Sequence, residues 1–233
     1  TLYFGGGSPS LYPLDLLQEL FFTLHSRFRL ELRECTLEAN PWELTLERLE
    51  RWKKLGVNRL SIGLQSSDGE ILKKVNRPMP PDLVERLERA VDFFDNVNLD
   101  FILGLPGENR INVENNLKLI ERLKPAHISY YMFDSDHETD LMASVKNGII
   151  ELPDKDTVEK LHDFIVLSLK ELGFTRYEIS SWSKDRISLH NLKYWKNGDY
   201  KGFGVSAGSH EGATRSLNFD SLGQYIDSIA AGK

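Results

Sequence analysis

A chain of 233 residues is long enough for one large domain or two small ones with a substantial core. Its net charge of −6 argues against a broad nucleic-acid-binding face, and its 40% hydrophobic content is that of an ordinary globular protein. No apolar run approaches the length of an integral membrane segment, and the single Cys35 excludes an internal disulfide, so we expect a cytoplasmic protein.

The first stretch combines a short apolar run at residues 2–4 with three glycines, a Ser-Pro pair and a helix expected at 14–28. Glycines let the backbone approach a small ligand closely, and a following helix N-terminus favours a carboxylate or a phosphate. The alternative is a tight strand-to-helix turn that needs glycine for its geometry alone. The glycines by themselves do not separate the two interpretations.

Strands and helices alternate along the rest of the chain, with short connections between them. We expect further strands at 35–37, 59–66, 97–103, 127–133 and 176–180. We expect further helices at 44–55, 69–75, 82–94, 113–123 and 157–172. This alternation predicts an α/β fold with a parallel sheet, either an incomplete (β/α) barrel or an open doubly wound sheet. Residues 1–180 are expected to form the partial barrel and 181–233 a C-terminal extension.

Polar residues and glycines fall at the C-terminal ends of the expected strands, which is the edge where α/β folds bind ligands. They are Gly5 to Ser8, Glu38 with Asn40, Gln65 with Ser66, and Gly104 to Glu108. Asp100 lies inside an apolar strand, where a carboxylate needs a ligand, a hydrogen bond or an internal salt bridge. The set suits a ligand that carries hydroxyls and amines.

The last third carries aromatic residues and histidine beside a glycine-rich segment. They are His190, Asn191, Tyr194, Trp195 and Tyr200. Such a cluster could stack on a flat ligand, and imidazole can ligate a metal. It could equally pack a terminal extension onto the barrel.

Several motifs in order along nearly the whole chain carry a family resemblance. They are G-G-G-S-P at 5–9, E-A-N-P at 38–41, N-R-L-S-I-G-L-Q-S at 58–66, N-L-D-F-I-L-G-L-P-G at 98–107, Y-E-I-S at 177–180 and H-N-L-K-Y-W at 190–195. The chain resembles the radical S-adenosylmethionine (SAM) enzymes. Within them it is most similar to the oxygen-independent coproporphyrinogen III oxidase family and its HemW-like heme chaperone branch.

The resemblance implies a partial TIM-like barrel of the radical SAM type whose rim holds a [4Fe-4S] cluster and SAM. It implies that Gly5, Gly6, Gly7 and Ser8 face the methionine part of SAM. It assigns the amino, carboxylate or ribose contacts of that cofactor to Glu38, Gln65, Arg77 and Asp100. It also suggests His190 as a heme-contacting residue, supported by Tyr194 and Trp195. It assigns no catalytic residue.

The chain departs from the family pattern at both ends. The first strand and the C-x-x-x-C-x-x-C cluster motif would precede Thr1, and an accessory domain would follow Lys233. Iron–sulfur clusters need several thiolates, which Cys35 cannot supply alone. We therefore expect a fragment that assembles no cluster as given and offers no metal site of its own.

Three functions remain open on the sequence. The first is a heme chaperone that takes heme as its ligand and passes it to a heme-acceptor protein. The second is an oxygen-independent coproporphyrinogen III oxidase, an oxidoreductase acting on a porphyrinogen. The third sets the resemblance aside and assumes a different (β/α)-barrel enzyme with a phosphate-ester site on the rim. The H-N-L-K-Y-W signature favours the chaperone, while carrier and enzyme are not separated.

Overall fold

The computed structural model describes residues 1–136 and 138–232. The chain divides into two compact units, Thr1–Ile187 and Ser188–Lys233.

A seven-stranded sheet forms the centre of the first unit, with the strand order β1-β2-β3-β4-β5-β7-β6. Its strands are β1 (Leu2–Phe4), β2 (Cys35–Ala39), β3 (Arg59–Gln65), β4 (Val97–Leu103), β5 (His127–Met132), β6 (Thr175–Arg176) and β7 (Ser181–Ser183). The first five strands are parallel and follow one another in chain order. This arrangement confirms the expected α/β class, in which each parallel strand needs a crossover helix.

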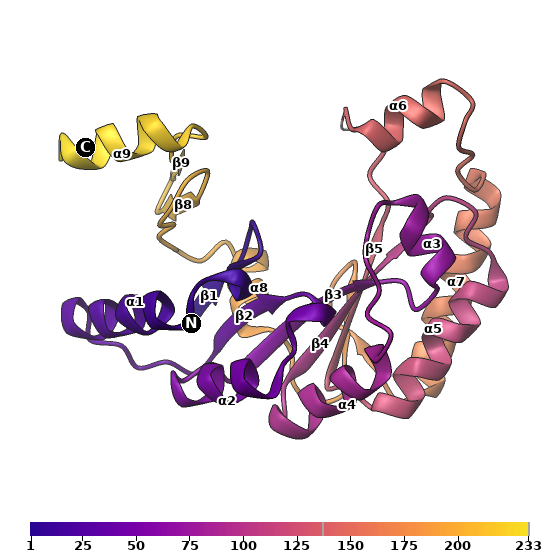
Figure 1. Cartoon of the computed structure of the whole chain (residues 1–233), viewed down its shortest axis with the longest axis horizontal. Coiled ribbons are helices and arrows are strands. Elements are labelled where there is room, and N and C mark those ends of the chain that lie inside the picture. The colour runs from indigo at the N-terminus through magenta and orange to yellow at the C-terminus, as the bar shows by residue number, and fades with distance from the viewer. Residues whose placement is uncertain (137, 233) are drawn as a thin grey trace. The chain divides into compact units, whose positions relative to one another are not determined.

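The helices of the first unit connect these strands. They are α1 (Leu14–Arg27), α2 (Leu46–Lys54), α3 (Gly69–Lys74), α4 (Leu83–Phe93), α5 (Arg110–Leu123), α6 (Asp140–Lys146) and α7 (Lys155–Glu171), with short 3₁₀ turns at Pro9–Leu11 and Pro41–Glu43. In Figure 1, α1, α2, α4, α5 and α7 lie along one side of the sheet. These five helices therefore do not cover the opposite face of the parallel strands.

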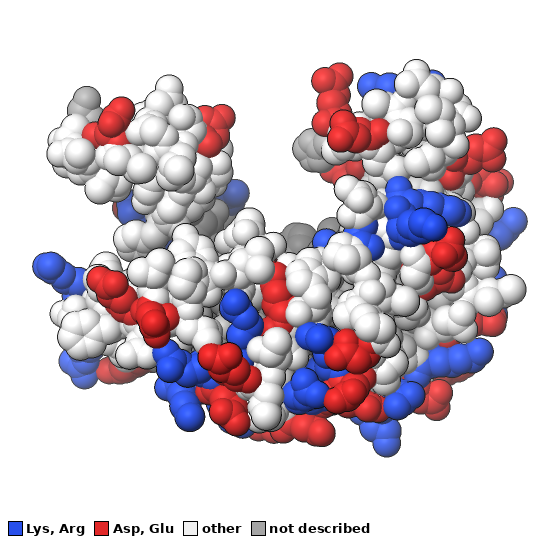
Figure 2. All heavy atoms as spheres, in the orientation of Figure 1, with Lys and Arg blue, Asp and Glu red and all other residues white. Residues whose placement is uncertain are grey.

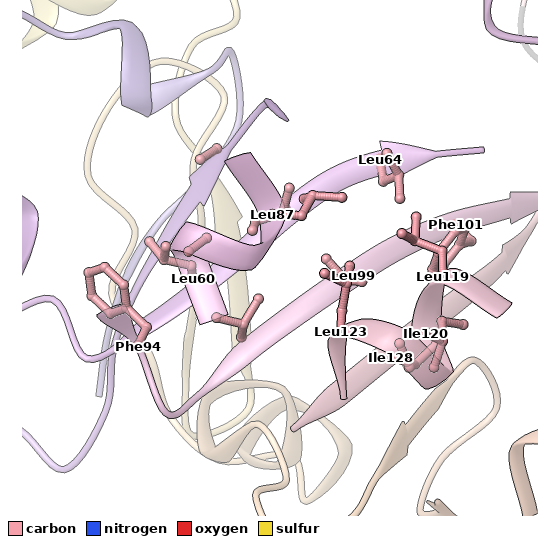
Figure 3. Close-up of a cluster of buried hydrophobic side chains, with 14 of the residues drawn as sticks. Leu60, Leu64, Leu87, Phe94, Leu99, Phe101, Leu119, Ile120, Leu123 and Ile128 are labelled. Carbon is pink, nitrogen blue, oxygen red and sulfur yellow. The ribbon is translucent and has the colours of Figure 1, made fainter. Parts of the chain in front are cut away.

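The main hydrophobic core lies between the sheet and this helical layer. Figure 3 shows Leu60, Leu99 and Ile128 of neighbouring strands beside Leu87 of α4 and Leu123 of α5. Because successive side chains of a strand point to opposite faces, the strand residues next to Leu60, Leu99 and Ile128 in sequence point to the other side of the sheet. The hydrophobic effect thus fixes which face of each strand the helices cover.

Two details of the expected sheet are wrong. Residues 176–180 do not form one strand, because the chain turns there between β6 and β7; the Arg176 guanidinium donates to the carbonyls of Glu178 and Ile179 inside that turn. The sheet is also not parallel throughout, since β7 is antiparallel to β5 and to β6.

One helix begins earlier than its apolar pattern predicts. The expected helix at 113–123 starts at Arg110, because Asn109 caps it: the Asn109 side chain accepts from the Ile111 N–H at 2.8 Å, and Asn112 accepts from the Asn109 N–H at 2.8 Å. The first turn of α5 contains polar Arg110 and Asn112 and an exposed Ile111, so the buried apolar stripe that marks the helix starts three residues later.

The second unit contains a short helix, a hairpin and a terminal helix. They are α8 (Leu189–Trp195), β8 (Gly208–Glu211), β9 (Thr214–Leu217) and α9 (Leu222–Ala230). Tyr200 pairs with His210 through two backbone hydrogen bonds of 2.9 Å. On α9, Leu222, Ile226 and Ile229 are exposed. Most of the surface of α9 that faces the viewer in Figure 2 is accordingly uncharged.

Charges of both signs are mixed over the outer helices of the first unit. Figure 2 shows basic and acidic side chains side by side over α2 and α4, and α4 carries the ion pairs Arg86–Asp82 and Arg89–Glu85. Exposed pairs of this kind contribute little to stability, but they keep the surface well hydrated. Within the described ranges, no helix combines the length and the apolar character that a membrane crossing requires.

Candidate functional site

The face of the sheet opposite the main helical layer is lined by polar residues on five neighbouring strands. They are Tyr3 and Gly5 in and after β1, Thr36, Glu38 and Asn40 in and after β2, Arg59, Ser61, Gly63 and Gln65 in β3, Asn98 and Asp100 in β4, and His127, Ser129 and Tyr131 in β5. We call this set the inner face. The strand register aligns its members across the sheet, because Glu38 pairs with Ser61 and Gly63 with Asp100.

The glycine loop is tied to Glu38 at the C-terminal end of β1. The Tyr3 hydroxyl donates to Glu38 Oε1 at 2.7 Å, and the Gly6 N–H donates to Glu38 Oε2 at 2.9 Å. A Cβ atom at Gly5 would lie 2.5 Å from Tyr3 Cε1 and 2.9 Å from Glu38 Oε1. A side chain at position 5 would therefore displace Tyr3 or Glu38. Burial together with the Glu38 carboxylate raises the pKa of Tyr3.

Arg77 reaches the same end of the sheet from the loop after α3. Its Nη2 donates to Asn40 Oδ1 and to the Gly63 carbonyl, both at 2.7 Å, and Asn40 Nδ2 donates to Ser8 Oγ at 3.2 Å. A Cβ at Gly63 would lie 2.9 Å from that Nη2. Burial lowers the pKa of Arg77, while the nearby carboxylates oppose this shift. Ser8, Asn40 and Arg77 thus form one connected group at the rim.

Gln65 closes β3 in an unusual conformation. Its φ is +68°, in the left-handed region, and the pairing of β3 with β4 shifts register between Gly63 and Gln65. A bulge of this kind redirects a side chain, and a non-glycine residue with positive φ is sustained only where its surroundings compensate the strain. The bulge places the Gln65 amide beside Gly63, since Nε2 lies 3.1 Å from the position of a Cβ there.

Asp100 lies in the middle of β4, below the rim. Ser61 Oγ donates to its Oδ2 at 2.8 Å and Asn98 Nδ2 donates to its Oδ1 at 2.7 Å. Burial raises the pKa of Asp100, and the hydrogen bonds from Ser61 and Asn98 oppose the shift. Among the described residues it forms no ion pair, so the salt bridge that the sequence left open is replaced by neutral donors.

Glu108 follows the glycine-containing loop after β4. It is 3% exposed, and the Gly104 N–H donates to its Oε2 at 2.7 Å. Its Oε1 is buried and has no hydrogen-bond partner. Burial raises the pKa of this carboxyl to about 7, against the opposing effect of the Gly104 and Leu105 N–H groups. Glu108 thus holds its own loop closed rather than presenting a free carboxylate at the rim.

The family model described as "Radical SAM superfamily" matches residues 1–120. The chain belongs to the radical SAM superfamily. It is 32% identical to the heme chaperone HemW of Bacillus subtilis over 235 residues, which is 99% of this chain and 62% of that protein. It is 32% identical to HemW of Lactococcus lactis, over 97% of this chain and 61% of that one. The predicted similarity to the HemW branch is confirmed.

Other relatives extend the comparison. The mouse protein named radical S-adenosyl methionine domain-containing protein 1, mitochondrial, is 34% identical over 89% of this chain and 48% of its own length. The solved structure of HemN from Escherichia coli, a coproporphyrinogen III oxidase, superposes with a TM-score of 0.85 at 24% identity, over 99% of this chain and 56% of that one. This structural likeness confirms the partial TIM-like barrel. The chain spans about three fifths of the HemW proteins that it matches.

The inner face of this radical SAM chain has the chemistry that SAM requires. The cofactor carries an ammonium group and ribose hydroxyls, which need acceptors, and a carboxylate, which needs a donor. Glu38, Gln65 and Asp100 offer acceptor oxygens, and Arg77 offers guanidinium donors on the same face. These predicted site residues are therefore brought together by the fold with the Gly5–Ser8 loop.

The described residues do not fit the [4Fe-4S] cluster that radical SAM proteins use. Cys35 is the single cysteine of the 233 residues, and its side chain lies on the helix-covered side of β2, where it is fully buried. Burial raises the pKa of its thiol to about 12, which suppresses the thiolate that a cluster needs. Among the described residues, His, Cys, Asp and Glu form no group of three suited to a metal ion.

The predicted heme-contacting residues form their own cluster in the second unit. His190 Nε2 lies 2.7 Å from the Tyr194 hydroxyl oxygen, and the two rings meet edge to face at 4.8 Å between centroids. Tyr200 contacts Tyr194 in the same way at 4.5 Å. Burial raises the pKa of Tyr194, while Trp195 is 57% exposed. The helix α8 thus brings His190 and Tyr194 together and leaves Trp195 open to solvent.

Sequence reasoning missed several members of the inner face. Tyr3, Ser61, Asn98 and His127 were not singled out, although each hydrogen-bonds within it. A signal was available: polar residues or glycine occupy every second position from 59 to 65, and Asn98 and Asp100 continue the pattern in the next strand. Alternation of period two marks one polar face along a strand.

Proposed function

We propose that this chain is the core of a HemW-like heme chaperone, which binds SAM on the inner face and heme through the second unit. The observation that carries the proposal is the 32% identity to proteins named heme chaperones, along 99% of the chain and therefore through both units. The acceptor-rich inner face and the His190 cluster support it independently. Because the chain spans about three fifths of those relatives, the activity and partners of the whole protein are part of the proposal.

We assign the cofactor contacts by charge complementarity. The backbone of Gly5, Gly6, Gly7 and Ser8 would lie along the methionine part, and Glu38 would accept from its ammonium. Arg77 would pair with the carboxylate, a group that suits its forked donors. When bound together, SAM and a reduced [4Fe-4S] cluster supply one-electron chemistry.

The two remaining polar residues would bind the other end of the cofactor. Asp100 pairs with Gly63, and Gln65 pairs with the next residue of β4, Phe101. Gln65 and Asp100 would both accept from the ribose hydroxyls. Asp100 is partly buried, so such a contact would form in a lower dielectric than bulk water, which strengthens it. All of these residues act by binding and orientation.

We assign heme to the α8 cluster. His190 would offer its imidazole to the iron and release Tyr194 in exchange, and the exposed indole of Trp195 would lie against the porphyrin face. Imidazole is an ordinary iron ligand, and an aromatic ring offers a flat apolar surface to the macrocycle. The heme would then pass to an acceptor protein. The setting we propose is cytoplasmic, which the single buried thiol of the chain fits.

Hemin titration tests this assignment. We expect a shifted and sharpened Soret band on binding, and a loss of affinity of about tenfold or more in His190→Ala, equivalent to about 1.4 kcal/mol or more. His162→Ala on α7 is the matched control, because that histidine lies in the first unit and is only partly buried. Equal hemin affinity in the two variants would contradict the assignment of His190.

The competing functions predict different results in the same preparation. Turnover of coproporphyrinogen III by the cluster-reconstituted protein with its natural flanking sequence, without a Soret shift on hemin addition, would support an oxidase instead. A phosphate-ester site is disfavoured because the Gly6 N–H already donates to Glu38, whose carboxylate would repel a phosphate. Isothermal titration of SAM against phosphate esters separates this last alternative.

A further inference from the structure

A chain of hydrogen bonds runs from the turn before β7 to the carboxylate of Asp100. The Tyr177 hydroxyl oxygen lies 2.7 Å from His127 Nε2, and His127 Nδ1 lies 2.7 Å from Asn98 Oδ1. Asn98 Nδ2 then reaches Asp100 Oδ1, also at 2.7 Å. We call these three residues, Tyr177, His127 and Asn98, the relay. It joins three separate segments of the chain, the β6–β7 turn, β5 and β4.

The direction of every bond in the relay follows from the Asp100 carboxylate. An ionised carboxylate only accepts, so the amide nitrogen of Asn98 must face it. That nitrogen also donates to Ser61 Oγ at 2.8 Å, which leaves Asn98 Oδ1 as an acceptor toward His127. His127 therefore carries its proton on Nδ1, and its Nε2 accepts from the Tyr177 hydroxyl.

His127 can hold this arrangement because its ring stays neutral. The side chain is fully buried, and burial together with the Arg59 guanidinium lowers the pKa of His127 well below its ordinary value. A neutral imidazole has one N–H and one lone pair, which match the acceptor on Asn98 and the donor on Tyr177. The hydrogen bonds of the relay therefore all keep the same donor-to-acceptor direction near neutral pH.

Other titratable groups face Asp100 and bear on its ionisation. Arg59 from β3 lowers the pKa of Asp100 by its positive charge, and Arg77, in the loop after α3, interacts with Asp100 by charge. The phenols of Tyr3 from β1 and Tyr131 from β5 also interact with Asp100 by charge, and Glu178 of the turn interacts with Tyr131 by charge. Burial raises the pKa of both phenols, to about 12 for Tyr131, so the two phenols are uncharged near neutral pH.

We propose that Tyr177, His127 and Asn98 are positioning residues that hold the Asp100 carboxylate ready to accept from the cofactor. This inference rests on the proposed SAM-binding function, because it gives Asp100 its ligand. Tyr177 acts at a distance, by fixing which ring nitrogen of His127 is protonated. Without its hydroxyl, the other tautomer becomes available, Nδ1 turns into an acceptor, and the Asn98 amide can rotate and present oxygen to Asp100.

Nitrogen-15 spectra of the histidine rings test the relay in the chain itself. In the wild type we expect the Nδ1–H tautomer at His127, assigned by the signal lost in His127→Gln. In Tyr177→Phe we expect the two ring nitrogens to move toward each other in chemical shift as the tautomers mix. Tyr130→Phe is the control: Tyr130 is more buried than Tyr177 and its hydroxyl also accepts a hydrogen bond, from Asn116 at 2.8 Å, but on the helix-covered side of β5.

The spectra can overturn the relay directly. Unchanged His127 shifts in Tyr177→Phe would do so, and so would an equal change in Tyr130→Phe, because a general loss of packing would then explain both. A change confined to Tyr177→Phe supports the relay. None of these readings depends on cluster or cofactor.

SAM affinity as a function of pH tests the use of the relay, in the cluster-reconstituted protein with its natural flanking sequence. In Tyr177→Phe the Asn98 amide no longer has to donate to Asp100, and loss of that donor raises the pKa of Asp100. As the pH is lowered, we therefore expect SAM affinity to fall at a higher pH in this variant than in the wild type. We also expect it to weaken by about tenfold at neutral pH, with Tyr130→Phe unchanged.

The two levels of the inference fail separately. Wild-type SAM affinity in Asp100→Ala would overturn the cofactor role of Asp100, whatever the histidine spectra show. Weakened binding in Asp100→Ala with an unchanged pH profile in Tyr177→Phe would overturn the positioning role alone. If SAM affinity is lost at a higher pH in Tyr177→Phe and binding is weakened in Asp100→Ala, the cofactor role of Asp100 and the positioning role of the relay are both supported.

Discussion

The buried carboxyl of Glu108 makes the stability of the first unit depend on pH in a way that one substitution removes. Its Oε2 accepts from the Gly104 N–H and its Oε1 has no hydrogen-bond partner, so ionisation places a negative charge where little water can reach it. Glu108→Gln is neutral at every pH and keeps an oxygen that can accept from the same N–H. The variant therefore mimics the protonated form of the wild type.

The size of the effect follows from the two pKa values of Glu108. The ordinary pKa is 4.5 and burial raises it to about 7 in the folded chain. The folded state thus binds the proton more tightly than the unfolded state, so the stabilising contribution is fully present below pH 4.5 and is lost as the pH rises through about 7. The difference corresponds to about 3 kcal/mol at most.

Denaturant unfolding at a series of pH values between 5 and 8 measures this contribution. We expect the free energy of unfolding of Glu108→Gln, relative to wild type, to rise with pH by about 2–3 kcal/mol over that range. Glu114→Gln on α5 is the control, since that carboxylate is partly exposed in an ion pair with Arg110 and should give a nearly constant difference. A difference for Glu108→Gln that stays flat from pH 5 to 8 would refute the reasoning.

Three further substitutions or probes address other parts of the first unit. Asp100→Asn should weaken SAM binding by about tenfold or more in the cluster-reconstituted protein with its natural flanks, as measured by calorimetry; unchanged affinity would leave this carboxyl a structural role only. Gly5→Ala should lower the free energy of unfolding by about 1–3 kcal/mol, because its Cβ would meet Tyr3 at 2.5 Å, whereas Gly223→Ala, whose Cβ would meet Ser221 Oγ at 4.0 Å, should cost nothing measurable. Cys35 should resist alkylation at pH 8 until the chain is unfolded, because its thiol is buried with a pKa of about 12; rapid labelling of the native chain would contradict its placement.

The regular part of the fold was predictable because each element carries a strong local signal. Residues 59–65 and 97–101 alternate apolar residues with polar ones or glycine, which identifies strands with one helix-covered face. The helix that begins at Leu14 and the one that ends at Glu171 show apolar spacing that a helix needs to pack on a sheet. Local pattern and tertiary structure agree at these elements.

The rest depended on contacts that no local pattern reports. His127 and Tyr177 are separated by 50 positions, and their hydrogen bond exists only because β7 returns antiparallel beside β5. The strained backbone at Gln65 arises from a bulge in its pairing with β4, not from its own preference. For the same reason a strand was predicted at 176–180, although side-chain hydrogen bonds to the backbone fold that segment into a turn.

The hydrogen-bonded inner face also bears on how the strands find their partners during folding. If β4 slipped by one residue, Asn98 and Asp100 would turn into the leucine-rich layer beneath α4 and α5, and Leu99 would replace them beside Ser61. Such a slip would bury a carboxyl and an amide without donors, at a cost of several kcal/mol. The residues proposed to bind the cofactor therefore also penalise misalignment, so that selection for binding and selection for correct assembly act on the same positions.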